Sequence, residues 1–182
     1  MNQAIFAFAS KHKNKISGRV MEVGSRDING TVRAVLPVTI GIDFIDGTGV
    51  DKVMNVTDLL AEFGPESFDC VVSCDALEHI EDWDAAWLNM WGVLKTGGVA
   101  LLTMAGPWKG MHGYPHDYHR MPLKDFVRVF GTNKVLDVFE GGPSLGAVVI
   151  KSADLDMTIR PGPVGKPKAR KAEEWHSLHT QN

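Results

Sequence analysis

The densest group of residues that could do chemistry lies in the segment KGMHGYPHDYHRMP, residues 109–122. Within nine residues it carries the titratable and aromatic side chains His112, Tyr114, His116, Asp117, Tyr118, His119 and Arg120. A neutral histidine can take a proton near neutral pH, and a histidine cluster beside a carboxylate can also hold a metal ion. Loops this rich in reactive groups more often serve a function than folding alone.

Three interpretations of this loop stay open. In the one we favour, the loop captures a substrate, and His116 is the general base with His119 as the next candidate. The residues expected to position the substrate are Tyr114, Asp117, Tyr118 and Arg120. In the second interpretation, His112, His116 and His119 bind a metal ion together with an oxygen of Asp117. In the third, the polar groups only tie the loop to the fold. We expect no metal.

A second candidate site lies in VMEVGSRDING, residues 20–30, where a buried-strand pattern runs into Gly24 and a polar loop. Asp43 ends the next apolar run, 19 residues after Gly24 (43 − 24). An acid at this place can accept hydrogen bonds from both hydroxyls of a ribose. The loop lacks the further glycines that let a backbone approach a pyrophosphate, while Glu22 and Asp27 supply negative charge for a cationic group. A nucleoside with a cation and no phosphate, such as S-adenosylmethionine, fits this combination.

The elements that must position these residues alternate between apolar strands and amphipathic helices. Strands are predicted at 19–23, 38–44, 50–56, 68–73, 98–104, 134–140 and 145–151. Continuous apolar strands that alternate with helices indicate a doubly wound, mostly parallel α/β sheet. Only Gly141, Gly142 and Pro143 separate the last two strands, which predicts an antiparallel hairpin at the edge. The predicted fold is a seven-stranded Rossmann-like sheet with that hairpin.

Two helices are predicted from apolar residues at helical spacing. The first carries Trp87, Met90, Trp91 and Leu94 with Gly97 as its stop, and the second carries Leu123, Phe126, Val127 and Phe130 after Pro122. Trp83 lies one helical turn before Trp87. Because no basic groove accompanies these tryptophans, we expect them in the core and at its rim rather than on a base-stacking platform.

Five segments in order resemble the motifs of class I S-adenosylmethionine-dependent methyltransferases, over residues 15–151. They are MEVGSRDING, GIDF, VMNVTDL, FDCVVSCDALEHI and LKTGGVALLT, and the LEHI run is typical of the small-molecule branch. The resemblance implies that Asp43 binds the ribose of the cofactor, and that Asn55 and the backbone of Val56 meet its adenine. The remaining cofactor contacts are expected at Glu22, Gly24, Ser25, Phe44 and Cys74.

The resemblance implies methyl transfer from S-adenosylmethionine to a small hydroxylated acceptor, with S-adenosylhomocysteine as the product. Residues 114–120 resemble the YP-x-DY-x-R signature of methyltransferases that modify cell-surface sugars or small metabolites, so a sugar-like acceptor is one option. Oxygen is favoured over nitrogen as the acceptor atom. Two alternatives remain open. One is an NAD-type dinucleotide-dependent oxidoreductase, and the other is a non-catalytic adenosyl-binding or interaction module.

The composition predicts one globular methyltransferase domain, residues 1–152, followed by a flexible basic tail, residues 153–182. The chain has 182 residues, 44% of them hydrophobic, which is enough for a core of its own. The segment RPGPVGKPKARK, residues 160–171, has three prolines, two glycines and five basic residues and no acid. Such a segment cannot bury enough apolar surface to fold alone.

The net charge and the cysteines limit which partners and which cellular compartment we expect for the protein. The net charge of −3 argues against a nucleic-acid partner. Cys70 and Cys74 lie close together in one apolar segment, which is a poor disulfide framework and indicates a reducing compartment. The sequence shows no signal-peptide pattern and no apolar run near the roughly 18–20 residues that span a bilayer. We expect a cytoplasmic protein that meets a small-molecule acceptor and no membrane; its oligomeric state stays open.

Overall fold

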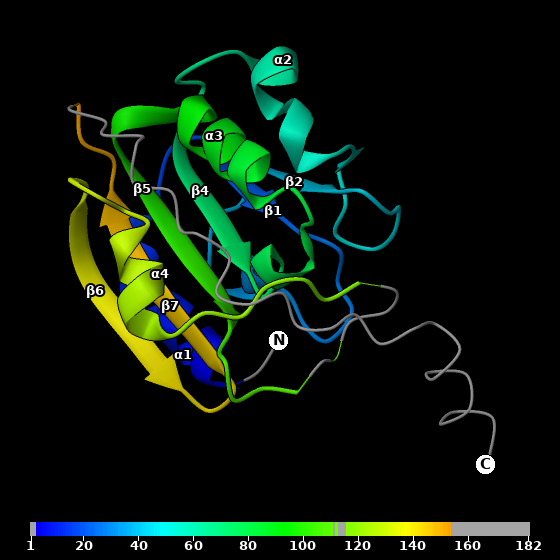
Figure 1. Ribbon diagram of the computed structural model, residues 1–182. Coiled ribbons are helices and arrows are strands. Elements are labelled where there is room, and N and C mark those ends of the chain that lie inside the picture. Colours follow the sequence, from blue (N-terminus) through cyan, green and yellow to red (C-terminus); the bar gives the residue numbers. More distant parts are fainter. Residues whose placement is uncertain (1–2, 111, 113–115, 154–182) are drawn as a thin grey trace.

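The computed structural model describes residues 3–110, 112 and 116–153. Its centre is a seven-stranded sheet in the order β3-β2-β1-β4-β5-β7-β6 (Figure 1). The strands are β1 (Val20–Val23), β2 (Ile40–Asp43), β3 (Lys52–Val53), β4 (Phe68–Cys74), β5 (Leu94–Ala105), β6 (Lys134–Gly141) and β7 (Ser144–Ile150). Strands β1 to β5 run parallel, whereas β7 is antiparallel to both β5 and β6. The predicted fold and its edge hairpin are confirmed.

The central strands form because their side chains are covered on both faces. All four residues of β1 are buried, and β4 is buried from Cys70 to Ser73. Strands of this kind read as continuous apolar runs, which is the pattern that predicted them. The strand order reverses between β1 and β4, so the carboxyl ends of these two strands flank the switch point where α/β proteins bind ligands.

Three helices cover one face of the sheet (Figure 1). They are α2 (Leu59–Phe63), α3 (Trp83–Val93) and α4 (Leu123–Arg128). The ring centre of Trp87 lies 4.3 Å from that of Trp91 and 5.5 Å from that of Phe130. Trp91 and Phe130 are fully buried, and Trp83 and Trp87 nearly so. The tryptophan series therefore belongs to the core, as predicted, where its large apolar area stabilises the packing of α3 on the sheet.

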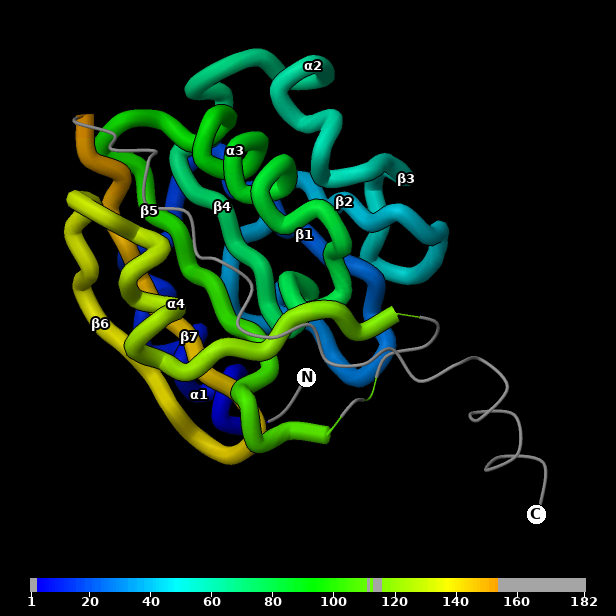
Figure 2. Tube along the Cα trace, in the orientation of Figure 1, coloured from blue at the N-terminus to red at the C-terminus, as the bar shows by residue number. Residues whose placement is uncertain are grey.

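The opposite face is covered by α1 (Gln3–His12), which lies over the β6–β7 hairpin (Figure 2). Phe8 stacks on Phe139 of β6 with ring centres 5.1 Å apart, and Nε2 of His12 lies 2.8 Å from the carboxylate of Asp137. The remaining turns are η1 (Lys13–Lys15), η2 (Val32–Ala34), η3 (Val56–Asp58) and η4 (Leu77–His79). Between β1 and β2 the chain forms only η2, so this face has a lighter cover than the other.

Helix α3 ends earlier than predicted. It stops at Val93, and Leu94 is already extended and begins β5. Gly97, the predicted stop, lies inside β5 with a φ of +79°. The ammonium of Lys151 donates hydrogen bonds to the carbonyls of Trp91 at 2.9 Å and Leu94 at 2.6 Å. A buried side chain that is distant in sequence therefore satisfies carbonyls that have no partner within the helix.

The predicted domain boundary at residue 152 falls where the described chain ends. Residues 154–182 lie outside the described residues, so the tail stays a prediction. Within the part of the chain that the structure describes, no helix has the length and apolar character that crossing a membrane requires.

Candidate active site

Four parallel strands end along one edge of the sheet, and polar residues follow them there. Gly24, Asp43, Asp75 and Gly106 stand at or directly after the ends of β1, β2, β4 and β5. Turn η4 and the described part of the loop after β5 meet at the same edge. Because the carboxyl ends of parallel strands bind ligands in this class of fold, the edge is the candidate site.

Gly24 forms the turn after β1, and its neighbours leave no room for a side chain. Its φ is +77°, a conformation that L-residues with a Cβ rarely adopt. A Cβ there would lie 2.3 Å from the Cβ of Ala76, in the segment after β4. Ser25, the next residue, is only 2% exposed, and its Oγ has no hydrogen-bond partner among the described residues. The glycine therefore lets the turns after β1 and β4 approach each other.

The N–H groups of residues 24–27 all donate to acceptors within the protein. The N–H groups of Gly24 and Ser25 donate to the carbonyl of Ile42 at 2.9 and 3.0 Å. The N–H of Arg26 donates to the carboxylate of Asp43 at 3.3 Å, and that of Asp27 to the carbonyl of Thr48 at 2.8 Å. A dinucleotide-binding loop presents free N–H groups to a pyrophosphate, and this loop has none at these four positions.

Asp43 ends β2 with its carboxylate at this edge. One oxygen accepts the N–H of Ile45 at 3.0 Å and the other accepts that of Arg26 at 3.3 Å. A carboxylate has about four lone-pair sites, so each oxygen can still accept a hydroxyl. Phe44 follows with 64% of its surface exposed, beside Ile45 at 42%. An acceptor pair next to exposed apolar surface fits a ribose and a flat base.

Asn55 precedes η3 and caps it. Its side-chain oxygen accepts the N–H of Thr57 at 3.0 Å, which is the role of an N-cap residue. Asn55 itself is exposed, whereas the side chain of Val56 is buried in the core. The cap is a structural role for Asn55, and the predicted adenine contacts of Asn55 and the Val56 backbone stay predictions.

Glu22 lies on β1 beneath η2. It is 4% exposed, and burial raises the pKa of its carboxyl to about 7, against the opposing effect of Arg33, whose Nε lies 3.4 Å away. The guanidinium of Arg33 also pairs with Asp51, so it is shared between two acids. At the end of β4, burial raises the pKa of the Cys74 thiol. The predicted cofactor contacts of Glu22 and Cys74 stay predictions.

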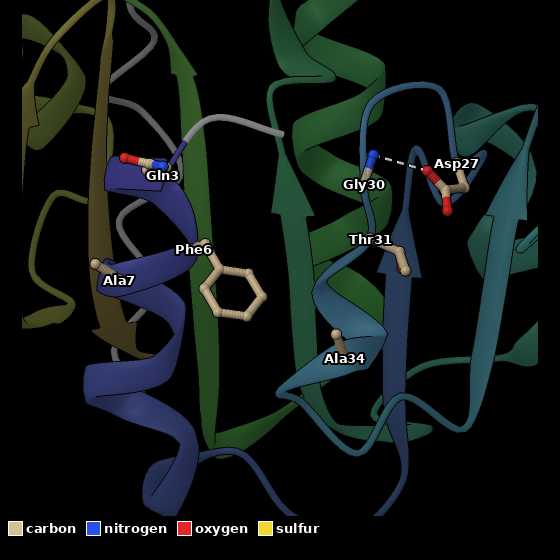
Figure 3. Close-up of a pocket in the computed structure, with 7 residues that line it drawn as sticks. All are labelled: Gln3, Phe6, Ala7, Asp27, Gly30, Thr31 and Ala34. Atoms are coloured by element: carbon tan, nitrogen blue, oxygen red, sulfur yellow. Dashed lines mark hydrogen bonds between the residues drawn. The ribbon is translucent and has the colours of Figure 1, made fainter.

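An open pocket lies between α1 and η2, beside the loop after β1 (Figure 3). Asp27 stands at its rim, and its Oδ1 accepts the N–H of Gly30 at 2.8 Å. This bond closes a short turn and engages the carboxylate in shaping the loop. The pocket is lined by Gln3, Phe6, Ala7, Asp27, Gly30, Thr31 and Ala34.

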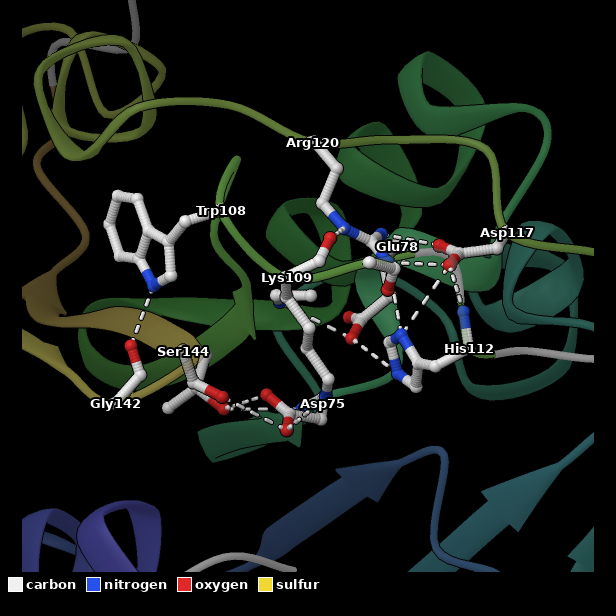
Figure 4. A network of polar contacts seen from close by, with 12 residues as sticks. Asp75, Glu78, Trp108, Lys109, His112, Asp117, Arg120, Gly142 and Ser144 are labelled. Atoms are coloured by element: carbon white, nitrogen blue, oxygen red, sulfur yellow. Dashed lines mark hydrogen bonds and ion pairs between the residues drawn. The ribbon is translucent and has the colours of Figure 1, made fainter. Parts of the chain in front are cut away.

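Asp75 links the end of β4 to the end of β5 and the start of β7. Its φ is +51°, which is costly for a residue with a side chain. Its carboxylate accepts the hydroxyls of Thr103 at 3.3 Å and Ser144 at 3.2 Å, and the ammonium of Lys109 lies 3.8 Å away (Figure 4). These contacts hold the strained turn in place at the edge of the site.

Glu78 is the most deeply buried acid at this edge, with no exposed surface. One oxygen accepts the N–H of Ala105 at 3.2 Å, and Oε2 has no hydrogen-bond partner among the described residues. Burial raises the pKa of the carboxyl to about 8. The carbonyl of Glu78 accepts the N–H groups of Tyr118 at 2.7 Å and His119 at 3.2 Å, so η4 anchors the loop after β5.

Asp117 and Arg120 form the centre of that loop (Figure 4). Asp117 is 6% exposed, and its two oxygens pair with the two terminal nitrogens of Arg120. The same carboxylate accepts the N–H of His112 at 2.9 Å. Nδ1 of His112 lies 3.0 Å from Arg120, and its Nε2 lies 3.7 Å from Glu78. The predicted substrate residues Asp117 and Arg120 are thus paired with each other and hold His112 toward Glu78.

His116 and His119 lie on the same loop but have different neighbours. The exposed ring of His116 stacks beside Tyr118 with centres 5.2 Å apart. Nε2 of His119 lies 3.3 Å from the carbonyl of Glu81, and its ring meets the edge of Trp83. The catalytic roles of both histidines and the substrate role of Tyr118 stay predictions. Tyr114, a further predicted substrate residue, lies outside the described residues.

One group of side chains in the described chain has the composition and spacing of a metal site: Glu78, His79 and His112. One ligand atom from each lies within 4.8 Å of the others. Of the histidines that the sequence suggested as ligands, only His112 belongs to this group. Glu78 and His79 were not among the site residues predicted from the sequence, and the signal that could have found them is an acid–histidine pair a few residues after a central strand.

Comparison with known proteins supports the architecture. The model of a family described as "Methyltransferase domain" matches residues 41–102, from β2 into β5. No match is found among the curated proteins. Many solved structures share the fold.

Three of these structures illustrate the likeness. Phosphoethanolamine N-methyltransferase 2 of Haemonchus contortus, with S-adenosyl-L-methionine, matches at a TM-score of 0.60 and 16% identity, over 81% of this chain and 52% of that one. The 1,6-didemethyltoxoflavin-N1-methyltransferase of Burkholderia thailandensis, with S-adenosylhomocysteine, matches at a TM-score of 0.59 and 10% identity, over 82% of this chain and 77% of that one. An S-adenosylmethionine-dependent methyltransferase of Mesorhizobium loti matches at a TM-score of 0.59 and 13% identity, over 82% of this chain and 99% of that one.

At these identities the likeness shows the fold, and this chain spans about half the length of the Haemonchus enzyme. The family match covers the segments that resembled the second to fifth motifs, and the sheet order and edge hairpin agree with the same class. The chain therefore shares the fold of S-adenosylmethionine-dependent methyltransferases, and its residues 41–102 match a methyltransferase-domain model.

Proposed function

We propose that the chain transfers a methyl group from S-adenosylmethionine to a small hydroxylated acceptor. One observation carries the proposal. At the switch edge, Asp43 offers carboxylate oxygens to a ribose, while the N–H groups of residues 24–27 are all engaged within the protein. The edge therefore suits a nucleoside without phosphates better than a dinucleotide. The methyltransferase-domain match over residues 41–102 supports the same choice.

The residues at this edge fit the proposed cofactor. Asp43 would accept the ribose hydroxyls, and Phe44 and Ile45 present exposed apolar surface for the adenine. The buried Oγ of Ser25, which has no partner among the described residues, is a polar group of the kind that a ligand satisfies. When bound, S-adenosylmethionine supplies an electrophilic methyl group on a sulfonium.

The chain's own residues would then hold the acceptor and remove its proton. The loop anchored by Glu78 brings His116 and His119 to the carboxyl edge, where either can take a hydroxyl proton as a general base. Tyr118 and Arg120 on the same loop would orient the acceptor, because an in-line displacement demands alignment of the attacking atom.

The two free cysteines, Cys70 and Cys74, support the proposed cytoplasmic setting.

Two observations bear on the acceptor atom. Two of the structural neighbours are named N-methyltransferases, which favours including amines beside hydroxylated compounds in any screen. The loop at 114–120 supports a hydroxylated, sugar-like acceptor through its resemblance to the YP-x-DY-x-R signature. We therefore retain oxygen as the proposed acceptor atom.

Calorimetry and a transfer assay test the proposal. S-adenosylhomocysteine should bind with one site per chain and raise the melting temperature, and NAD should do neither. Incubation with methyl-labelled S-adenosylmethionine and a panel of sugars, phenols and amines should label a hydroxylated compound. Stabilisation by NAD alone would establish the oxidoreductase alternative. Cofactor binding with no transfer to any class of acceptor would favour the non-catalytic module.

A further inference from the structure

We propose that Glu78, His79 and His112 form a binding site for a divalent transition-metal ion of the Zn²⁺ type. These residues come from η4 and from the loop after β5, and Figure 4 shows Glu78 and His112 turned toward each other. Two imidazoles and one carboxylate are the ligand set that suits such ions and leaves positions open for another ligand.

Glu78 gives the first independent reason to place a cation here. Its side chain has no exposed surface, and Oε2 has no partner within the described chain. A buried carboxylate is costly unless a charge or hydrogen bonds compensate it. The ammonium of Lys109 pairs with Asp75 and the guanidinium of Arg120 with Asp117, so among the described residues neither forms an ion pair with Glu78. A metal ion would supply the missing positive partner.

His79 gives the second reason. Its Nδ1 lies 2.9 Å from the carbonyl of His116. A carbonyl oxygen only accepts, so Nδ1 carries the hydrogen and Nε2 keeps a free lone pair. A ring N–H donated to a backbone carbonyl is the support that metal-binding histidines usually have. His79 is therefore already in the tautomer that a metal at Nε2 requires.

His112 completes the site after one tautomeric change. Arg120 lies 3.0 Å from its Nδ1, so without an ion Nδ1 accepts, and Nε2 carries a hydrogen toward Glu78. When an ion takes the Nε2 position, the imidazole keeps one hydrogen, now on Nδ1. Asp117, with Oδ2 at 3.4 Å, can accept it, which gives a carboxylate–histidine–metal arrangement. Arg120 keeps its other bonds to Asp117 and to the carbonyls of the loop.

The spacing needs a modest closure. The three ligand atoms lie within 4.8 Å of one another, and bonds of about 2.0–2.2 Å to one ion would bring them to roughly 3.4 Å. Glu78 is fully buried, whereas the side chain of His112 is 32% exposed and lies on a loop, so the closure is assigned to a rotation of the His112 side chain. If the proposed methyl transfer holds, an acceptor hydroxyl bound at an open position would lose its proton more readily.

Zinc binding to the full chain tests the site directly. The sequence also contains His176 and His179, three residues apart, which could bind zinc by themselves. Calorimetric titration with ZnCl₂ is therefore run on the native chain and on a background in which both are replaced by alanine. One equivalent should bind in both.

Within that background, Glu78→Gln, His79→Ala and His112→Ala should each weaken zinc binding by about 10–100-fold or more. His119→Ala, on the same loop but outside the group, should leave it unchanged. Glu78→Gln preserves the buried volume, and His112→Ala removes a partly exposed ring. A circular dichroism spectrum and a melting temperature close to the native ones show that each variant is folded.

Zinc binding that survives all three substitutions, or that disappears with His176 and His179, would mean an adventitious ion only and would overturn the proposal. The outcome is separable from the proposed reaction. If zinc binds at this site but no acceptor is methylated, the proposed metal site stands and the proposed function is contradicted. If an acceptor is methylated by a chain that binds no zinc, the proposed function stands and the proposed metal site is contradicted.

Discussion

Gly24 and Ala76 are in such close contact that a Cβ on the glycine would come within 2.3 Å of the alanine Cβ. Gly24→Ala adds this collision to the strain of a φ of +77°. We expect the variant to lose more than the roughly 1–2 kcal/mol that a left-handed alanine costs alone. Chemical denaturation of the variant and the native protein measures the loss.

The two contributions can be separated within the chain. Gly97 has a φ of +79° but nothing within 4 Å of its Cβ position, so Gly97→Ala reports backbone strain alone. Ala76→Gly added to Gly24→Ala should recover the difference between the two single variants. Equal losses at Gly24 and Gly97 would show that the contact with Ala76 carries no cost.

Asp43→Ala should weaken the binding of S-adenosylhomocysteine by about 1–3 kcal/mol, because the ribose hydroxyls would lose their acceptor. Calorimetry measures the affinity. Asp43→Asn keeps one side-chain oxygen that can accept an N–H of the loop. Comparison with Asp43→Ala therefore separates the effect of a disturbed loop from the loss of the ribose contact. Asp46→Ala, an exposed acid in the same loop, is the control. Unchanged affinity in Asp43→Ala would remove the ribose assignment.

Glu22→Gln should become more stable relative to the native protein as pH rises. Burial raises the pKa of Glu22 from 4.5 to about 7, so the folded state keeps a proton that the unfolded state releases. The native free energy of unfolding therefore falls between about pH 4.5 and 7, and the penalty persists above that range. The difference should grow by about 1–3 kcal/mol from pH 5 to pH 8. Urea denaturation at both pH values measures it, with Glu62→Gln as the exposed control; a pH-independent difference would contradict the burial effect.

Asp117→Asn should destabilise the loop after β5. The side chain of Arg120 is only 9% exposed, and the substitution leaves its charge without an acid partner. Breaking a buried ion pair from one side costs about 3–5 kcal/mol. Asp125→Asn provides a matched case, because its partner Arg128 is 77% exposed and such a pair contributes at most about 1 kcal/mol. Thermal denaturation compares the two, and similar losses would show that the Asp117 pair is no more than a surface contact.

His116→Ala should lower methyl transfer by about 10²–10⁴-fold while S-adenosylhomocysteine still binds. The reason is loss of the proposed base, and initial rates with the acceptor found in the screen measure it. His119→Ala should have the smaller effect. Equal rates in both variants and the native protein would take general-base catalysis away from this loop.

The strands were predictable because their signal is local. The run from Cys70 to Val72 is apolar, and burial on both faces is what such a run requires. The hairpin followed from Gly141, Gly142 and Pro143, which leave too short a connection for a parallel crossover. These features depend on neighbours in sequence.

Other features depend on contacts that no local pattern reveals. Helix α3 ends at Val93 rather than Gly97 because Leu94 already belongs to β5 and Lys151 bonds the carbonyls of the helix end. The approach of His112 to Glu78 joins residues 34 apart (112 − 78), through a loop that Asp117 and the Glu78 carbonyl hold. The sequence could identify the loop that carries His112, but not the acid and the histidine after β4 that this loop meets.

The packing of α1 against β6 has a consequence for biosynthesis. Phe8 is synthesised more than a hundred residues before Phe139 and Asp137, which hold α1. Until then α1 lacks its partners on β6 and β7, and part of its apolar face stays uncovered. Completion of this face is thus delayed until the hairpin has been synthesised, and shortened translation products would be natural clients for chaperones.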